Sequence, residues 1–299
     1  MKELTGVCVP ICTPFDKSGE KLDETALKNH IDSMIEAGVH IILVCGGTGE
    51  FPYLRADEKR RIAEISAKHI DGRATFMVQT SAISTSETIE FTKHAEGVGA
   101  DAVMVLPPYF EGPDIEGVHY HYEKVARSVK VPLMVYNIPQ SSGINITPEF
   151  FSRLLEIDNI QYIKDSTADL TQIQALLGTG GKVFNGGDPI TFQALLSGCP
   201  GCVWGAVNAM PKEAVELFNL VSANKLVEAR DLWQRIFPAQ LYFWNSVYNA
   251  AVKAATNMSG RPVGNCRLPV QPLSNEQLAG LSEALAPLGI GAAQQKIAV

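Results

Sequence analysis

The chain has 299 residues, of which 46% are hydrophobic and 19% are charged, and its formal net charge is −7. These values are typical of a folded globular protein, and the length suits one large α/β domain as well as two ordinary ones. The negative charge argues against nucleic acid or an anionic membrane surface as a partner. It does not exclude a small anionic substrate, because a local site can be positive inside a negative molecule.

The sequence predicts a cytoplasmic location. No apolar segment is long enough for a signal peptide or a membrane span. All the cysteines fall in predicted strands or tight loops of a large chain, which indicates free thiols in a reducing compartment. Cys199 and Cys202 have the spacing of a redox or zinc pair, but no second pair and no nearby histidine completes a site. We therefore expect them to be structural and expect no metal site.

Short apolar segments alternate with amphipathic helical segments along the chain. Several of the apolar segments lack polar alternation, as parallel strands covered on both faces do. The predicted strands are Gly6–Ile11, Val39–Val44, Ala74–Gln79, Ala102–Leu106, Pro132–Tyr136, Ile160–Lys164, Lys182–Asn185 and Gly201–Trp204.

The segments between the strands carry helix start signals, namely side chains that cap a first turn and prolines suited to the first helical position. These signals are Asp23, a possible capping box of Ser84 and Glu87, Thr147-Pro148, Asp188-Pro189 and Met210-Pro211.

Strand–helix pairs repeated eight times over residues 1–224 predict a (β/α)₈ TIM barrel. A doubly wound open sheet is the alternative, but the chain has no clear nucleotide fingerprint. Residues 225–299 predict additional C-terminal helices, roughly Leu226–Asn257 and Asn275–Leu285, packed on the barrel or on a partner subunit. No linker separates the two parts, so we expect a single structural unit.

One apolar strand ends in a lysine, Lys164. Strand alternation predicts that Ile160, Tyr162 and Lys164 share a face. A partly desolvated ammonium loses its proton more easily, and the neutral amine can attack a carbonyl to form an imine. The alternative is an ion pair of Lys164 with Asp165 or Asp169. The barrel favours the catalytic interpretation, because active sites in this fold lie at the carboxyl ends of the strands.

Two other strand ends carry residues suited to the same chemistry. Gly46-Gly47-Thr48-Gly49 can present consecutive backbone N–H groups to a carboxylate, although it is also an ordinary tight turn. It lacks the lysine of a nucleotide P-loop. Tyr136 ends the strand beside that of Lys164, where its phenol can relay protons during imine formation. Its alternative is a core tyrosine with a satisfied hydroxyl.

Three motifs, in this order and spacing, carry a family resemblance: Gly46-Gly47-Thr48-Gly49-Glu50, Tyr136-Asn137-Ile138-Pro139 and Ile163-Lys164-Asp165-Ser166. Together they resemble the dihydrodipicolinate synthase / N-acetylneuraminate lyase family, and the resemblance covers nearly the whole chain. It implies a (β/α)₈ class I aldolase or lyase, usually a homotetramer (a dimer of dimers), without metal or organic cofactor.

The resemblance also implies roles for individual residues. Lys164 would form a Schiff base with pyruvate or another 2-oxo acid, and Tyr136 would shuttle protons. The amides of Gly47 and Thr48 would hold the substrate carboxylate. Gly186 and Val203 would line the site beside the imine.

Three departures argue against a dihydrodipicolinate synthase. That branch has a Thr at the position of Gly47. At the position of Phe110 it has a Tyr that reaches the site of the other subunit in the dimer. Two of the three hydroxyls of its proton relay are therefore missing here. It also has an Arg at Ser141, which binds the carboxylate of the incoming aldehyde. A substrate carboxylate would lose this bidentate contact.

The sialic acid lyase branch fits incompletely too. It uses an acidic pair and a serine to hold sugar hydroxyls, whereas this chain has Asp188 followed by Pro189, and Gly205 in place of the serine. Trp204 would narrow the rim of the pocket, which favours a shorter or flatter substrate. Thr167, Asp188 and Asn208 remain candidate polar contacts, with Ser141 and Gln140 facing them.

The sequence therefore predicts a lyase or aldolase that forms an imine at Lys164 and makes or breaks the C3–C4 bond, or dehydrates, a small 2-keto-3-deoxy acid. A dihydrodipicolinate synthase joining pyruvate to aspartate semialdehyde is the alternative within the family. A barrel that binds a 2-oxo acid or a phosphate without turnover is the alternative of another class.

Overall fold

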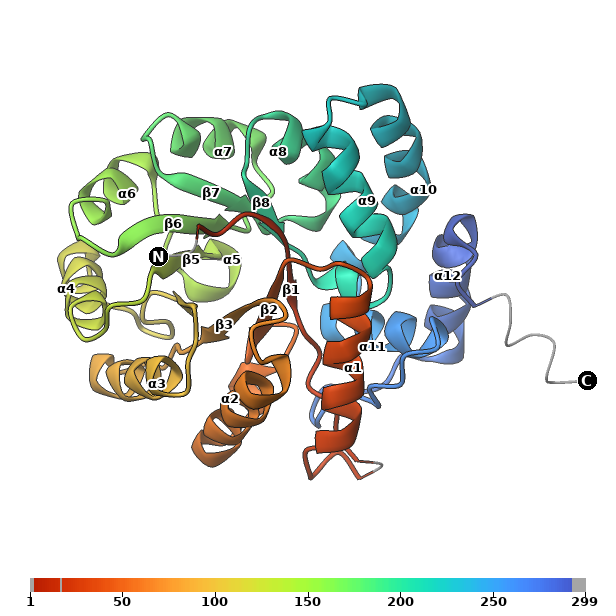
Figure 1. Ribbon diagram of the computed structural model, residues 1–299, viewed down its shortest axis with the longest axis horizontal. Helices are drawn as coiled ribbons and strands as arrows, with labels where there is room; N and C mark the ends of the chain where they lie inside the picture. Colours follow the sequence, from red (N-terminus) through yellow and green to blue (C-terminus); the bar gives the residue numbers. More distant parts are fainter. Residues whose placement is uncertain (1–2, 17, 292–299) are drawn as a thin grey trace, which may run out of the picture.

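Eight parallel strands form a closed barrel in sequence order, surrounded by helices (Figure 1). The computed structural model describes residues 3–16 and 18–291. This architecture confirms the TIM barrel and rules out the open sheet. The strands are β1 (Gly6–Pro10), β2 (Ile41–Val44), β3 (Thr75–Gln79), β4 (Ala102–Val105), β5 (Leu133–Asn137), β6 (Ile160–Asp165), β7 (Lys182–Asn185) and β8 (Gly201–Val203).

Helices follow every strand, and three more come after the last barrel helix. The α-helices are α1 (Glu24–Glu36), α2 (Ala56–Ile70), α3 (Thr85–Gly97), α4 (Ile115–Ala126), α5 (Pro139–Ser142), α6 (Pro148–Leu154), α7 (Leu170–Leu177), α8 (Thr191–Leu196), α9 (Pro211–Ser222), α10 (Leu226–Trp244), α11 (Tyr248–Met258) and α12 (Asn275–Leu285). Short 3₁₀ turns are η1 (Phe51–Tyr53), η2 (Asp188–Ile190), η3 (Gly205–Asn208) and η4 (Ala286–Leu288).

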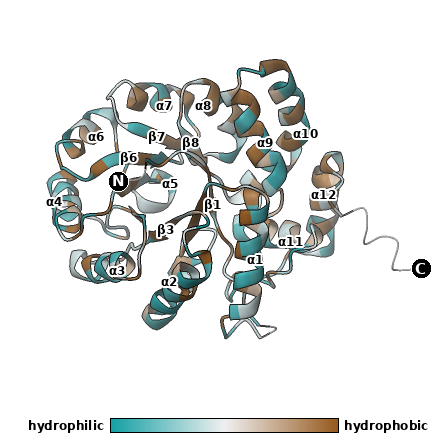
Figure 2. Cartoon of the chain, viewed as in Figure 1, coloured by the Kyte–Doolittle hydropathy of each residue, from teal (hydrophilic) through white to brown (hydrophobic). Residues whose placement is uncertain are grey.

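The strands separate two apolar layers, which explains why they are hydrophobic on both faces. Met134 and Phe184 lie in the cluster inside the barrel. Val135 and Val183, the neighbouring residues on the same strands, lie in the cluster between the barrel and its helices. Figure 2 shows the strands largely in the hydrophobic colour, while the helices carry hydrophilic residues on their outer surfaces.

The predicted face of β6 is correct at its end and wrong at its start. Tyr162 belongs to the cluster inside the barrel, but Ile160 belongs to the outer one. The cause is an irregularity in the pairing with β5, where Leu133 pairs with Ile160 but the next residue, Met134, pairs with Tyr162. Local alternation cannot predict such an irregularity, because the neighbouring strand imposes it.

The helix start signals are confirmed except for Asp188 and for the second half of the capping box at Glu87. The side chains of Asp23, Ser84 and Thr147 each accept a hydrogen bond from the first turn. Glu87 supplies its amide to Ser84, but the described contacts include no return bond from its side chain. Asp188 instead lies inside η2, and its carboxylate accepts from a tyrosine on α11.

The C-terminal helices α10, α11 and α12 gather beside α9 and α1 on one side of the barrel (Figure 1). The single helix predicted over Leu226–Asn257 is wrong, because the chain breaks between Trp244 and Tyr248 into α10 and α11. This break turns the start of α11 toward the carboxyl ends of the strands. Residues 292–299 of the predicted extension lie outside the described residues.

Within the described ranges, no helix combines the length and apolar character needed to cross a membrane. All six cysteines are buried free thiols, including Cys199 and Cys202. These two do not form a disulfide.

Candidate active site

Lys164 lies at the end of β6 with only 6% of its surface exposed. Its Nζ is 3.9 Å from the centroid of the Tyr136 ring on the neighbouring strand. Among the described residues, neither Asp165 nor Asp169 forms an ion pair with Lys164. Asp165 accepts from Asn137 and Thr167, and Asp169 accepts from the amide of Thr171. The ion pairs of the alternative interpretation are therefore not formed.

Gly186 is a glycine because Lys164 passes over it. A Cβ at Gly186 would lie 2.5 Å from Lys164 Cε and 2.2 Å from Ser166 Oγ. A glycine at position 186 therefore leaves the space that the Lys164 side chain occupies.

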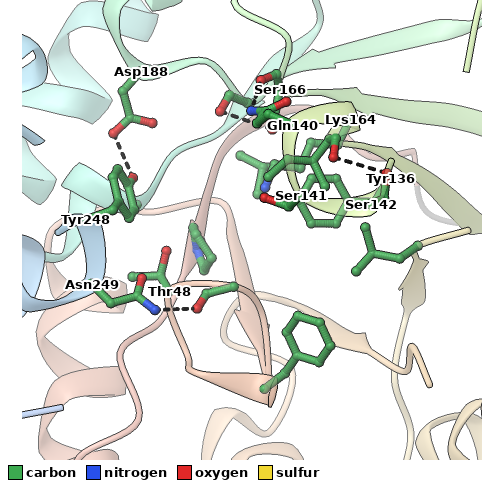
Figure 3. A pocket seen from close by; sticks show the side chains of 18 of the residues that line it. Thr48, Tyr136, Gln140, Ser141, Ser142, Lys164, Ser166, Asp188, Tyr248 and Asn249 are labelled. Atoms are coloured by element: carbon green, nitrogen blue, oxygen red, sulfur yellow. Dashed lines mark hydrogen bonds between the residues drawn. The ribbon is translucent and has the colours of Figure 1, made fainter. Parts of the chain in front are cut away.

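A cavity of about 610 Å³ opens above Lys164 at the carboxyl ends of the strands (Figure 3). Its volume is in the range of small-molecule sites. Most of the site residues predicted from the sequence line it, namely Gly47, Thr48, Tyr136, Gln140, Ser141, Lys164, Gly186, Asp188 and Val203. The barrel thus brings together strand ends that are far apart in the chain.

Four of the expected pocket residues lie outside this cavity. Asn208 is buried in η3, where its side-chain amide donates to the carbonyls of Pro10 and Gly205. Phe110 is 78% exposed after β4 with a φ of 61°, and Thr167 donates its hydroxyl to Asp165. Trp204 is buried between the barrel and α10, where its Nε1 donates to Gln240 Oε1 at 2.7 Å. The prediction that Trp204 narrows the rim is wrong, because Val203, its neighbour on β8, is the residue that faces inward.

The loop after β2 has free donors for an anion. Neither the Gly47 nor the Thr48 amide has an acceptor among the described residues, and both residues line the cavity. Two unused N–H groups next to each other can hold a carboxylate. The role of this loop as a carboxylate site stays a prediction.

Distant parts of the chain hold this loop in place. Asn249 on α11 donates to the Gly47 carbonyl at 2.9 Å, as Figure 3 shows. Thr13 donates to the Gly49 carbonyl at 2.7 Å. Glu50 ends the loop with a φ of 61° and forms a buried ion pair with Lys253, 2.6 Å between Oε1 and Nζ.

The hydroxyl of Tyr136 faces open space beside Gly47. A Cβ at Gly47 would have only this hydroxyl within 4 Å, at 3.9 Å. A threonine would fit there, so the missing hydroxyl of the synthase-like relay leaves a gap that substrate or water can fill.

Asp188 is a buried carboxyl group on the opposite wall. It is 2% exposed, and the hydroxyl of Tyr248 donates to its Oδ2 at 2.7 Å. Burial raises the pKa of Asp188 to about 7, while Tyr248 and Lys164 oppose that shift. Near neutral pH this group therefore exchanges a proton with little cost.

The sequence analysis missed the contribution of the C-terminal helices. Trp244, Tyr248 and Asn249 all line the cavity. Gln140, which the sequence did predict as a contact, lines it too and donates to the Ser166 carbonyl. The sequence contains no signal for the first three, because their approach depends on the break between α10 and α11. Packing on the barrel was expected, but a part in the site was not.

Charge in the cavity is sparse. Among the described residues, Lys164 is the only cationic side chain and Asp188 the only carboxyl group that line it. No group of three or more His, Cys, Asp or Glu suited to a metal ion occurs in the described parts of the chain.

The chain is similar to known proteins over nearly its full length. The model of the dihydrodipicolinate synthetase family matches residues 3–287. A 4-hydroxy-tetrahydrodipicolinate synthase from Syntrophobacter fumaroxidans is 35% identical, with 95% of this chain and 99% of that protein covered. One from Methanococcus maripaludis strain C6 is 34% identical, with 96% and 99% covered.

Solved structures agree with the sequence comparisons. A putative dihydrodipicolinate synthetase from Pseudomonas aeruginosa has a TM-score of 0.92 at 33% identity, covering 96% of this chain and 100% of that one. A dihydrodipicolinate synthase from Acinetobacter baumannii, solved with pyruvate, has a TM-score of 0.91 at 32% identity, with 96% and 100% covered. This chain therefore belongs to the dihydrodipicolinate synthetase family and is a Schiff-base lyase of that family.

Proposed function

We propose that Lys164 forms an imine with pyruvate and that the enzyme makes or breaks the C3–C4 bond of a small, hydroxylated 2-keto-3-deoxy acid with no charge beyond its C1 carboxylate. The observation that carries this proposal is the buried Lys164 amine, which has no ion-pair partner among the described residues and lies against Tyr136 in a cavity with unused amides. The pyruvate complex of the Acinetobacter baumannii relative supports the choice of the 2-oxo acid.

The proposed cycle begins when the neutral Lys164 amine attacks the C2 carbonyl. Tyr136 donates a proton to the carbinolamine hydroxyl, and loss of water gives an iminium ion. The Tyr136 phenolate then takes a C3 proton, which gives an enamine. The enamine carbon attacks an aldehyde, and the Tyr136 hydroxyl donates a proton to the oxygen of that aldehyde. Water hydrolyses the new iminium ion, which releases the product and Lys164 and returns a proton to Tyr136. The reverse sequence cleaves the same bond. Gly47 and Thr48 hold the carboxylate of the 2-oxo acid throughout.

The charge of the cavity supports a neutral second reactant. Ser141 lines the cavity at the position where synthases have an arginine, and no described lining residue other than Lys164 is cationic. A second carboxylate would have to leave water without a charged partner, which is costly.

A second candidate is 4-hydroxy-tetrahydrodipicolinate synthase activity. The observation in its favour is the name shared by the curated relatives at 33–35% identity. The gap beside Tyr136 and the missing arginine count against it.

Borohydride reduction in the presence of pyruvate tests the imine. We expect a covalent adduct at Lys164 in a peptide mass map, because reduction converts the imine into a stable secondary amine. Lys164→Ala should give no adduct. An unmodified Lys164 in the wild-type protein would contradict the proposal.

Product analysis then separates the two candidates. We expect pyruvate to be released from a panel of hydroxylated 2-keto-3-deoxy acids, with condensation of pyruvate and aspartate semialdehyde at least ~10-fold less efficient, since the loss of a charge-assisted contact is worth about that much. The opposite ratio would favour the synthase.

We also propose a homotetramer in the cytoplasm. The six free cysteines support a reducing compartment. Exposed apolar side chains near the carboxyl ends of the strands, such as Ile83, Phe110 and Ile115, support contact with another subunit.

A further inference from the structure

The wall of the cavity opposite Tyr136 is assembled from three separate elements. Asp188 comes from η2, Gly205 from η3 and Tyr248 from the start of α11. Figure 3 shows Tyr248 and Asp188 joined across this wall, on the far side of the cavity from Ser141 and Tyr136.

Tyr248 occupies the space that a side chain at position 205 would need. A Cβ on Gly205 would lie 2.3 Å from Tyr248 Oη and 2.8 Å from Thr48 Oγ1. The phenol hydroxyl therefore takes the place of a side chain on β8's loop, and it lies close to the loop that is proposed to hold the substrate carboxylate.

The pair presents an acceptor to the cavity. Tyr248 uses its only proton on Asp188 Oδ2, which leaves the lone pairs of its own oxygen for a ligand. The Asp188 carboxyl group also accepts from the backbone amides of Asp188 and Ala206. Both side chains are at the cavity wall, and Asp188 is buried. A hydroxyl group can donate to the Tyr248 oxygen, whereas a carboxylate cannot.

We propose that Tyr248, held by Asp188, is a specificity-determining residue that selects aldehydes carrying a hydroxyl group and rejects aldehydes carrying a carboxylate. This inference rests on the proposed function, because the aldehyde is the second reactant of the Lys164 enamine. Burial raises the pKa of Asp188 to about 7, because little water reaches the carboxyl group to solvate its charge.

The test compares two aldehydes of equal carbon number in condensation with pyruvate, glyceraldehyde and propanal. In the wild type we expect a higher kcat/KM for glyceraldehyde, because only this aldehyde carries hydroxyl groups. In Tyr248→Phe we expect the glyceraldehyde-to-propanal ratio to fall ~10-fold, the usual effect of one lost hydrogen bond to a partly charged acceptor. A purely structural role of Tyr248 would change both rates equally.

Tyr242→Phe is the matched control. Its hydroxyl donates to the Gln277 carbonyl at 2.6 Å, and Tyr242 is not among the residues that line the cavity. We expect this variant to keep the wild-type ratio. An unchanged ratio in Tyr248→Phe, with both aldehydes reacting, would overturn the inference and leave the proposed function intact.

Asp188→Asn provides a second, nearly isosteric variant. It keeps an acceptor for Tyr248 but removes the negative charge. We expect kcat/KM for succinic semialdehyde, an anionic aldehyde, to rise ~10-fold relative to propanal. No rise would contradict the rejection of carboxylates. If the wild type forms no borohydride adduct with pyruvate, the proposed function fails and this inference falls with it.

Discussion

At the scale of the residue, side chains that are absent matter as much as those present. Gly186 leaves room for Lys164, Gly205 leaves room for the Tyr248 hydroxyl, and Gly47 leaves a gap beside Tyr136. The first two glycines are required by close approach, because a Cβ would come within 2.5 Å of the neighbouring side chain. The third is open to substitution, so no packing constraint requires it.

Asp188 gives a pH-dependent stability prediction. Burial raises its pKa from 3.8 to about 7, so the folded protein holds this proton more tightly than the unfolded chain. The stabilisation is fully present below pH ~3.8 and is lost as the pH rises through about 7. Lys164 and Tyr248 face Asp188 and lower its pKa, but burial raises this pKa by more than they lower it.

We therefore expect Asp188→Asn to gain free energy of unfolding relative to the wild type as the pH rises from 4 to 8, by an amount on the order of 4 kcal/mol. Urea unfolding at a series of pH values measures this difference. Asp101→Asn, at a carboxylate that accepts from the amide of Phe76 outside the cavity, serves as the comparison. A difference that stays constant between pH 4 and 8 would contradict the raised pKa.

At the scale of the element, buried charges join the loop after β2 to the C-terminal part of the chain. Lys253 on α11 contacts Glu50 and donates to the carbonyls of Thr13 and Asn265 at 2.7 and 2.9 Å. Arg267 donates to both carboxyl oxygens of Glu58 and, through its backbone amide, to Glu50. The loop that offers the Gly47 and Thr48 amides is therefore held by residues about two hundred positions away.

Lys253→Met should destabilise the protein by about 3–5 kcal/mol, because it leaves the buried Glu50 carboxylate without its cation. Thermal unfolding measures this loss. Glu50 ends the loop that is proposed to hold the carboxylate. The pyruvate concentration for half-maximal borohydride trapping should therefore rise as well.

The double variant Lys253→Met/Glu50→Gln is the matched control for this charge effect. We expect it to recover part of the lost stability, because no unpaired charge remains in the core. If the double variant loses more stability than the two single variants lose together, an unpaired buried charge does not explain the effect of Lys253→Met.

At the scale of the whole molecule, the barrel and the C-terminal helices share one active site. Tyr248 and Asn249 of α11 line the same cavity as Lys164 of β6. The division of residues 1–224 and 225–299 into a barrel and a helical extension therefore describes the chain order, and we predict that the two unfold together.

The proposed homotetramer is tested by sedimentation velocity, where we expect a main species of four chains. Phe110 is 78% exposed and apolar, so a charge at this position should weaken contact between subunits. Phe110→Glu should shift the distribution toward dimers or monomers, while Phe110→Tyr, which keeps the ring, should not. A monomeric wild-type protein would contradict the proposal.

Much of the molecule was determined by the sequence itself. Apolar segments without alternation, separated by capped helices, predicted all eight strands of the barrel. The barrel then placed Lys164, Tyr136 and the Gly46–Gly49 loop at the same end, because parallel strands in this fold present their carboxyl ends together. These predictions need only local patterns and one topological rule, so the amino-acid sequence is sufficient to make them.

Only the tertiary structure decided the rest. The irregular pairing of β5 and β6, the inward face of Val203 rather than Trp204, and the turn that carries Tyr248 and Asn249 into the cavity all depend on neighbouring elements. Asp188 illustrates the reason. Next to a proline it predicts a helix cap, but its carboxyl group pairs with Tyr248, sixty residues later in the chain. Such contacts are set by packing between elements, which no local pattern of residues encodes.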